Sequence, residues 1–134
     1  MIAKILVIDD EPSIRSALDR VLRREGYEVL TASGVDTAHA ILSETTVDAI
    51  LLDLRMPKMS GESLYLSIVR RWPSLRGRVI LMTGHPYAVE DAWPADLRQC
   101  PLLTKPFDLA GLYRVLRSVL DQREGAPLSR DQSG

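Results

Sequence analysis

The sequence predicts an α/β fold in which one open, doubly wound parallel sheet carries helices on both faces. Five short apolar runs alternate with longer segments whose apolar residues have helical spacing. The runs lack strict alternation of polar and apolar residues, which is typical of strands buried on both faces of a parallel sheet. A length of 134 residues suits one domain, and a hydrophobic content of 46% predicts a packed core.

The apolar runs are the predicted strands. In chain order they are Ile5 to Ile8, Glu28 to Ala32, Ala49 to Leu54, Val79 to Met82 and Leu102 to Thr104. Each run is short and ends in polar or turn-forming residues, as expected of strands joined by helical crossovers.

Four of the intervening segments carry clear helix signals. The first begins at Pro12, a residue suited to the first helical turn, and Gly26 is a suitable C-cap. Its apolar stripe recurs at three- and four-residue spacing and consists of Ile14, Ala17, Leu18, Val21 and Leu22. The second helix is predicted over 35–43, the third over 61–72, and the last begins at Asp108, a good N-cap.

The fourth helix is predicted to be short or irregular. Pro86 and Pro94 bracket only seven residues, and a proline inside a helix costs about 3 kcal/mol. The C-terminal residues have a disorder-like composition, so we expect one domain over 1–123 and a disordered tail over 124–134. Five strands and five helices in about 120 residues match the size of a flavodoxin-like fold with strand order 2-1-3-4-5.

The composition narrows the class of protein. The formal net charge of −1 offers no basic excess, so we expect no direct binding to nucleic acid. Nothing in the chain approaches the ~18 apolar residues of a membrane span, and the N-terminal apolar stretch is too short for a signal peptide. The single cysteine, Cys100, fits a reducing compartment and a buried, inert thiol. We therefore expect a soluble, cytoplasmic protein with no membrane contact.

Acidic, hydroxyl and ammonium side chains stand at the ends of four of the five predicted strands. The residues at these ends are Asp9, Asp10 and Glu11 after the first, Asp53 within the end of the third, Thr83 and Gly84 after the fourth, and Thr104, Lys105 and Pro106 at the end of the fifth. Ligands of open α/β sheets bind beyond the carboxyl ends of the strands, so these side chains should share one rim.

The chemistry of this set points to a metal ion and a phosphoryl group. Clustered carboxylates repel one another and require a cation. Oxygen ligands without histidine or cysteine favour Mg²⁺. A metal ion and the ammonium of Lys105 together would stabilise the charge of a transferring phosphoryl group, and Thr83 could donate a hydrogen bond to it.

Four stretches at these strand ends also carry a resemblance to a known family: residues 5–12, 51–61, 81–84 and 103–107. Together and in this order they resemble the receiver domains of two-component response regulators, over residues 4 to about 120. The resemblance implies phosphorelay signalling, in which Asp53 accepts a phosphoryl group from a sensor histidine kinase or a histidine phosphotransfer protein. Such a domain is not an enzyme beyond self-catalysed phosphotransfer and autodephosphorylation. It would be a monomer or a weak, phosphorylation-dependent dimer that signals to a downstream protein.

The resemblance implies a metal site with four contributors. Asp53 matches the phosphoacceptor, Asp10 matches the acid that binds Mg²⁺ directly, and Asp9 matches the acid that usually acts through water. The backbone carbonyl of Arg55 matches the group that completes the site.

Two further residues match the family positions that handle the phosphoryl group. Thr83 corresponds to the switch hydroxyl, and Lys105 to the lysine that pairs with the acids and the phosphoryl group. The peptide bond between Lys105 and Pro106 is usually cis in the family. Many receivers carry an aromatic residue three positions before the lysine, where this chain has Leu102. We therefore expect a switch confined mainly to the loop after Thr83 and the proline-bracketed segment.

Other interpretations stay open. A degenerate receiver could serve only as a docking module. A small aspartyl-phosphate phosphotransferase of the haloacid-dehalogenase type would need a cap domain, and a second aspartate where this chain has Arg55. A flavodoxin-like module for a nucleotide or flavin would need a glycine- or hydroxyl-rich loop after the first strand, where acids stand here. Taken singly, Asp10 could be a helix cap and Thr83 an ordinary β-branched strand residue.

Overall fold

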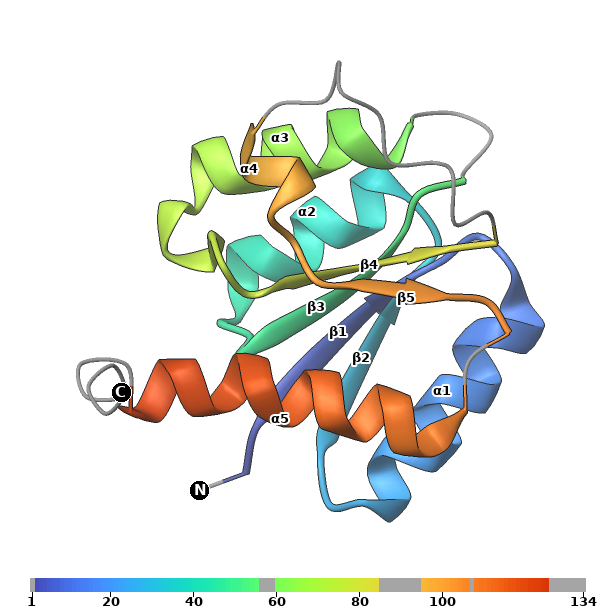
Figure 1. Cartoon of the computed structure of the whole chain (residues 1–134). Helices are drawn as coiled ribbons and strands as arrows, with labels where there is room; N and C mark the ends of the chain where they lie inside the picture. The colour runs from blue at the N-terminus through green and yellow to red at the C-terminus, as the bar shows by residue number, and fades with distance from the viewer. Residues whose placement is uncertain (1, 56–59, 85–94, 107, 126–134) are drawn as a thin grey trace.

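Figure 1 shows the computed structural model of the chain, which describes residues 2–55, 60–84, 95–106 and 108–125. A five-stranded sheet forms the middle layer, with strand order β2-β1-β3-β4-β5 and every pair parallel. The strands are β1 (Lys4–Ile8), β2 (Glu28–Ala32), β3 (Ala49–Asp53), β4 (Val79–Thr83) and β5 (Leu102–Thr104). The predicted sheet and its strand order are confirmed. Three strand ends differ slightly, since β1 begins at Lys4, β3 stops at Asp53 and β4 includes Thr83.

Helices cover both faces of the sheet. They are α1 (Pro12–Arg24), α2 (Val35–Glu44), α3 (Gly61–Arg71), α4 (Ala95–Arg98) and α5 (Leu109–Gly125), with a 3₁₀ turn at Pro73–Leu75. In Figure 1, α1 and α5 lie against one face, whereas α2 and α3 lie against the other. The doubly wound arrangement predicted from the alternation of elements is therefore present.

Two predicted segments fall largely outside the described residues. The proline-bracketed fourth segment, from Pro86 to Pro94, lies within residues 85–94, outside the described ranges, and α4 is described as four residues from Ala95 to Arg98. Most of the predicted tail also lies outside, while α5 is described as far as Gly125. None of the helices in the described ranges combines the length and the hydrophobicity that crossing a membrane requires.

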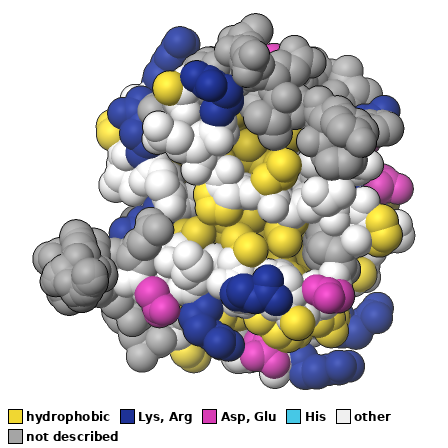
Figure 2. All heavy atoms as spheres, viewed as in Figure 1, with side chains coloured by type: hydrophobic (Ala, Val, Ile, Leu, Met, Phe, Trp, Pro, Cys, Tyr) yellow, Lys and Arg dark blue, Asp and Glu magenta, His cyan; other side chains and the backbone are white. Residues whose placement is uncertain are grey.

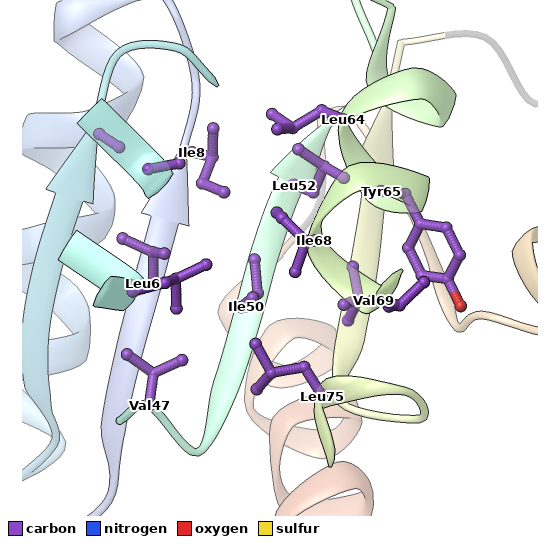
Figure 3. Close-up of a cluster of buried hydrophobic side chains, with 14 of the residues drawn as sticks. Leu6, Ile8, Val47, Ile50, Leu52, Leu64, Tyr65, Ile68, Val69 and Leu75 are labelled. Atoms are coloured by element: carbon purple, nitrogen blue, oxygen red, sulfur yellow. The ribbon is translucent and has the colours of Figure 1, made fainter. Parts of the chain in front are cut away.

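The apolar strands build two separate hydrophobic clusters, one on each face of the sheet. Along β1, Leu6 and Ile8 join the cluster beneath α2 and α3, whereas Ile5 and Val7 join the cluster beneath α1 and α5. Figure 3 shows the first cluster, in which side chains from β1 and β3 meet those of α3. Burying an aliphatic side chain contributes about 1.5–3 kcal/mol, so both faces of each central strand must be apolar.

The apolar stripe of α1 is narrower than its spacing predicted. Leu18 and Leu22 are buried, Ile14 and Val21 are half-buried, and Ala17 is exposed. The prediction that Ala17 faces the core is wrong, because one step along a helix rotates the side chain by about 100° away from Leu18. The expectation for Cys100 is also wrong, since this thiol is half-buried.

Capping and close packing position the helices next to the carboxyl edge of the sheet. At α3, the Oγ of Ser60 accepts a hydrogen bond from the N–H of Ser63 at 3.2 Å. A Cβ on Gly61 would lie 2.6 Å from the Cα of Leu54, so only glycine lets the helix approach the end of β3 this closely. At α5, Oδ1 of Asp108 accepts from the N–H of Gly111 at 2.8 Å, which confirms the predicted cap.

Candidate functional site

The parallel register brings four strand ends to one edge of the sheet. Asp53 ends β3 opposite Met82, and Thr83 ends β4 opposite Thr104. Asp9 follows β1 directly, and its N–H donates to the carbonyl of Ala32 at 3.1 Å. The predicted rim of polar side chains is therefore present at the carboxyl ends of the strands.

Three carboxylates gather at this edge. Asp9, Asp10 and Asp53 each place an oxygen within 4.8 Å of the others. Asp9 is 0% exposed and Asp53 is 4% exposed, while Asp10 is half-buried. Mutual repulsion of buried carboxylates favours a bound cation, and an all-oxygen donor set suits Mg²⁺. The residues present fit the metal that the sequence predicted.

Asp9 is held by donors on both carboxylate oxygens. Its Oδ1 accepts from the N–H of Glu11 at 2.9 Å, and its Oδ2 accepts from the Nζ of Lys105 at 3.1 Å. Because both partners belong to the loops that leave β1 and β5, this buried carboxylate ties two strand ends together.

Asp53 lies beside the same lysine. The Nζ of Lys105 is 3.7 Å from Oδ1 of Asp53, and the N–H of Arg55 donates to that oxygen at 3.1 Å. Burial raises the pKa of the Asp53 carboxyl to about 6, and the Asp9 carboxylate adds to the rise. The N–H of Arg55 and the ammonium of Lys105 act in the opposite direction on this pKa. Burial and a neighbouring carboxylate both disfavour the charged form of Asp53, and an added cation would stabilise that form.

Thr83 and Lys105 are joined through the backbone. Thr83 is 0% exposed, and its carbonyl accepts from the N–H of Lys105 at 2.6 Å. The peptide bond between Lys105 and Pro106 is cis, as the family resemblance implied. This arrangement places the hydroxyl-bearing residue and the lysine on neighbouring strand ends.

Arg55 contributes its backbone to the site, while its side chain is exposed. The role predicted for its carbonyl stays a prediction. His85, two residues after Thr83, and Phe107, directly after Pro106, lie outside the described residues.

Sequence reasoning missed one contact at the site. The Nη1 of Arg15 on α1 donates to the backbone carbonyl of Asp9 at 2.7 Å. The available signal was a long basic side chain placed early in the helix that follows the acidic run.

Comparisons with known proteins identify the same family from two directions. The chain matches the family model of the response regulator receiver domain over residues 5–117. The transcriptional regulatory protein GlrR of Escherichia coli (strain K12) is 34% identical over 121 residues, which cover 90% of this chain. That match makes up 27% of GlrR, so this chain spans about a quarter of the length of that relative.

Solved structures of receivers share the whole fold. A response regulator receiver domain protein from Clostridium thermocellum is 32% identical, with a TM-score of 0.80, and the match covers 92% of this chain and 98% of that chain. TrrA from Thermotoga maritima, solved in complex with Mg²⁺-BeF, is 28% identical with a TM-score of 0.78, over 89% of this chain and 100% of that one. TrrA has also been solved in complex with the histidine kinase ThkA. Sheet order, strand-end residues and sequence match agree, and this chain belongs to the receiver domain family of two-component response regulators.

Proposed function

We propose that this receiver domain accepts a phosphoryl group onto Asp53 from a phosphohistidine donor, in a reaction that depends on Mg²⁺. The observation that carries the proposal is the geometry around Asp53. Its buried carboxylate shares a cluster with Asp9 and Asp10 and lies 3.7 Å from the ammonium of Lys105. A purely structural ion pair would not require a third carboxylate, that of Asp10, beside the two that Lys105 faces.

The transfer itself needs little covalent chemistry from the protein. An oxygen of Asp53 forms a bond to phosphorus as the phosphorus–nitrogen bond of the donor imidazole breaks, and the bonding electrons leave with that nitrogen. Lys105 supplies a fixed positive charge beside the acceptor oxygen. We propose that the hydroxyl of Thr83 donates to a phosphoryl oxygen once the group is attached. Transfer and later hydrolysis are self-catalysed in this proposal, and the domain acts on no other substrate.

We assign the metal to Asp10, Asp53 and the backbone carbonyl of Arg55, with Asp9 acting through water. Both oxygens of Asp9 already accept hydrogen bonds from protein donors, which supports an indirect role. Among the described residues, no protein donor hydrogen-bonds the carboxylate of Asp10, which supports direct ligation. When bound, Mg²⁺ would supply positive charge to the phosphoryl oxygens. TrrA, a relative by sequence and fold, was solved with Mg²⁺-BeF.

The proposed donor is a sensor histidine kinase or a histidine phosphotransfer protein, as the complex of TrrA with ThkA supports. We propose that it docks on α1 beside the site. Ser13 and Ala17 are exposed there, and Pro106 is exposed on the loop that leaves β5. Ile14 packs partly against the core, so it contributes less free surface.

The outgoing partner is proposed to be a protein. Figure 2 shows the face that carries β5 and α5, where hydrophobic side chains gather in a band bordered by charged ones. Such surfaces suit protein contacts, including weak dimerisation on phosphorylation. The net charge of −1 supports no direct contact with nucleic acid. We also propose a cytoplasmic location and a folded unit over residues 1–123.

Labelling with acetyl phosphate tests the proposal without a kinase. In the presence of Mg²⁺, intact-protein mass spectrometry should detect one added phosphoryl group, and a chelator should suppress it. Asp53→Asn should abolish the labelling, whereas Asp19→Asn, a substitution on the outer part of α1, should retain it. Equal labelling of Asp53→Asn and the native chain would refute the acceptor assignment. A complete lack of labelling in the native chain would favour a degenerate docking module.

A further inference from the structure

Arg15 lies on α1, outside the acidic cluster, yet it binds the backbone that carries the cluster. Its side chain is half-buried, and its Nη1 donates to the backbone carbonyl of Asp9 at 2.7 Å. A hydrogen bond from a charged donor at this distance is among the stronger kinds found in proteins.

That carbonyl controls the orientation of the next residue. The carbonyl of Asp9 and the N and Cα atoms of Asp10 belong to one planar peptide group. Fixing the carbonyl oxygen therefore fixes the N–Cα bond of Asp10, which is the point from which its side chain projects. Among the described residues, no protein donor hydrogen-bonds the Asp10 carboxylate, so the structure restrains Asp10 through its backbone, to which Arg15 contributes from α1.

The N–H and the carboxylate of Asp9 are held by other hydrogen bonds. Its N–H pairs with Ala32 of β2, and its carboxylate binds the N–H of Glu11 and the ammonium of Lys105. Arg15 completes this set from the helix side. The turn between β1 and α1 is thus held by the sheet, by β5 and by α1 together.

The charge of Arg15 and its hydrogen bond to the turn should affect cation binding in opposite directions. A guanidinium close to a group of carboxylates attracts them but repels a cation, so removing it should tighten cation binding. Holding the turn in place should favour cation binding, so removing the hold should weaken it. The sign of the change in affinity separates the two roles.

We propose that Arg15 is a positioning residue for the cation site, which holds the peptide between Asp9 and Asp10 so that the Asp10 carboxylate meets the metal. This inference rests on the proposed function, because it concerns the same Mg²⁺ site.

The experiment is a Mg²⁺ titration of metal-free protein followed by amide NMR, which requires no phosphorylation. Arg15→Met keeps an unbranched apolar side chain and removes the donor, and it should raise the dissociation constant for Mg²⁺ about ten-fold. Arg23→Met is the matched control, since Arg23 on the same helix also donates to a backbone carbonyl, that of Val29, at 2.9 Å. The control loses the same charge and the same kind of bond, but its affinity for Mg²⁺ should stay close to that of the native chain.

A second readout reports the turn without metal. The N–H of Glu11 is held by the Asp9 carboxylate at 2.9 Å, and its hydrogen exchange should become faster in Arg15→Met but not in Arg23→Met. If Arg15→Met fails to fold, Arg15→Gln takes its place, because its amide ends well short of the guanidinium and should give the same loss.

Unchanged or tighter Mg²⁺ binding in the Arg15 variants would overturn this inference and leave the proposed function intact. Absence of Mg²⁺ binding in the native chain would overturn the proposed function, and this inference with it.

Discussion

The two ends of the sheet each pair a lysine with aspartate, but only one end concentrates negative charge. At the amino end, the N–H of Lys4 donates to Asp48 at 2.8 Å, and its ammonium donates to Thr45 at 3.1 Å and lies 4.0 Å from Glu28. At the carboxyl end, Lys105 faces two buried carboxylates. Surplus buried charge therefore distinguishes a site that calls for a ligand from a pair that merely closes a strand end.

Exchanging the two lysines for methionine gives the largest expected contrast. Lys105→Met removes the positive charge beside Asp53, so the initial rate of labelling by acetyl phosphate should fall about 100-fold or more. Lys4→Met should label at close to the native rate. Both rates can be followed by mass spectrometry at saturating Mg²⁺. A normal rate in Lys105→Met would remove the lysine from the proposed mechanism.

Neutralising one aspartate at each end should change stability in opposite directions. The Asp53 pKa is about 6 in the folded chain and 3.8 in the reference state, so the folded chain binds more protons between these values. Stability should therefore fall as pH rises from about 4 to about 6, and the penalty should be complete above that range. In metal-free buffer, the free energy of unfolding of Asp53→Asn should exceed that of the native chain by up to about 3 kcal/mol at pH 7. The two should differ little below pH 4.

Asp48→Asn provides the contrast, because it replaces the carboxylate that accepts the Lys4 N–H with a weaker amide acceptor. It should lose about 1–2 kcal/mol at neutral pH. Urea unfolding across the pH range measures both variants. A loss of stability in Asp53→Asn at pH 7 would show that the acidic cluster is not strained.

Mg²⁺ itself should stabilise the carboxyl end alone. A ligand present at 100 times its dissociation constant stabilises the folded state by about 2.7 kcal/mol. Mg²⁺ should therefore raise the unfolding temperature of the native chain. The same addition should raise the unfolding temperature of Asp10→Asn much less. Asp48→Asn should respond to Mg²⁺ as the native chain does. An equal response of Asp10→Asn and the native chain would place the metal elsewhere.

The smallest expected effect concerns the lifetime of the phosphorylated state. Arg55 has an exposed side chain two residues after Asp53, the proposed acceptor, where it could contact a phosphoryl oxygen or the attacking water. Arg55→Ala should change the rate of hydrolysis several-fold, which corresponds to about 1 kcal/mol, and should leave labelling intact. Arg70→Ala, an exposed arginine in the last turn of α3, is the control. Identical lifetimes in all three proteins would make Arg55 a bystander.

Much of the site could be predicted because a parallel sheet turns sequence order into proximity. Apolar runs ended in Asp9, Asp53 and Thr83, and the shared direction of the strands required these ends to meet. The prediction of Mg²⁺ followed from the donor atoms, and the identity of the metal stays a prediction. The cis bond before Pro106 came from the family resemblance, since no local pattern requires it.

Other features depend on packing that periodicity does not encode. Ala17 fits an apolar stripe by spacing, but the width of the buried stripe is set by how α1 sits on the sheet. The exposure of Cys100 likewise depends on packing, because this residue lies in the connection between α4 and β5. The contact of Arg15 with the Asp9 carbonyl requires one rotamer of a long side chain, which sequence spacing cannot select.

Gly61 limits how freely this receiver could be redesigned. Any side chain at that position would meet the backbone of Leu54, the residue directly after Asp53. Gly34, by contrast, has nothing within 4 Å of an added Cβ, and its extended backbone suits other residues. In a saturation library, position 34 should therefore accept many residues while position 61 accepts none without displacing the end of β3. The absence of a side chain at residue 61 therefore sets how closely α3 can approach the end of β3 that carries Asp53.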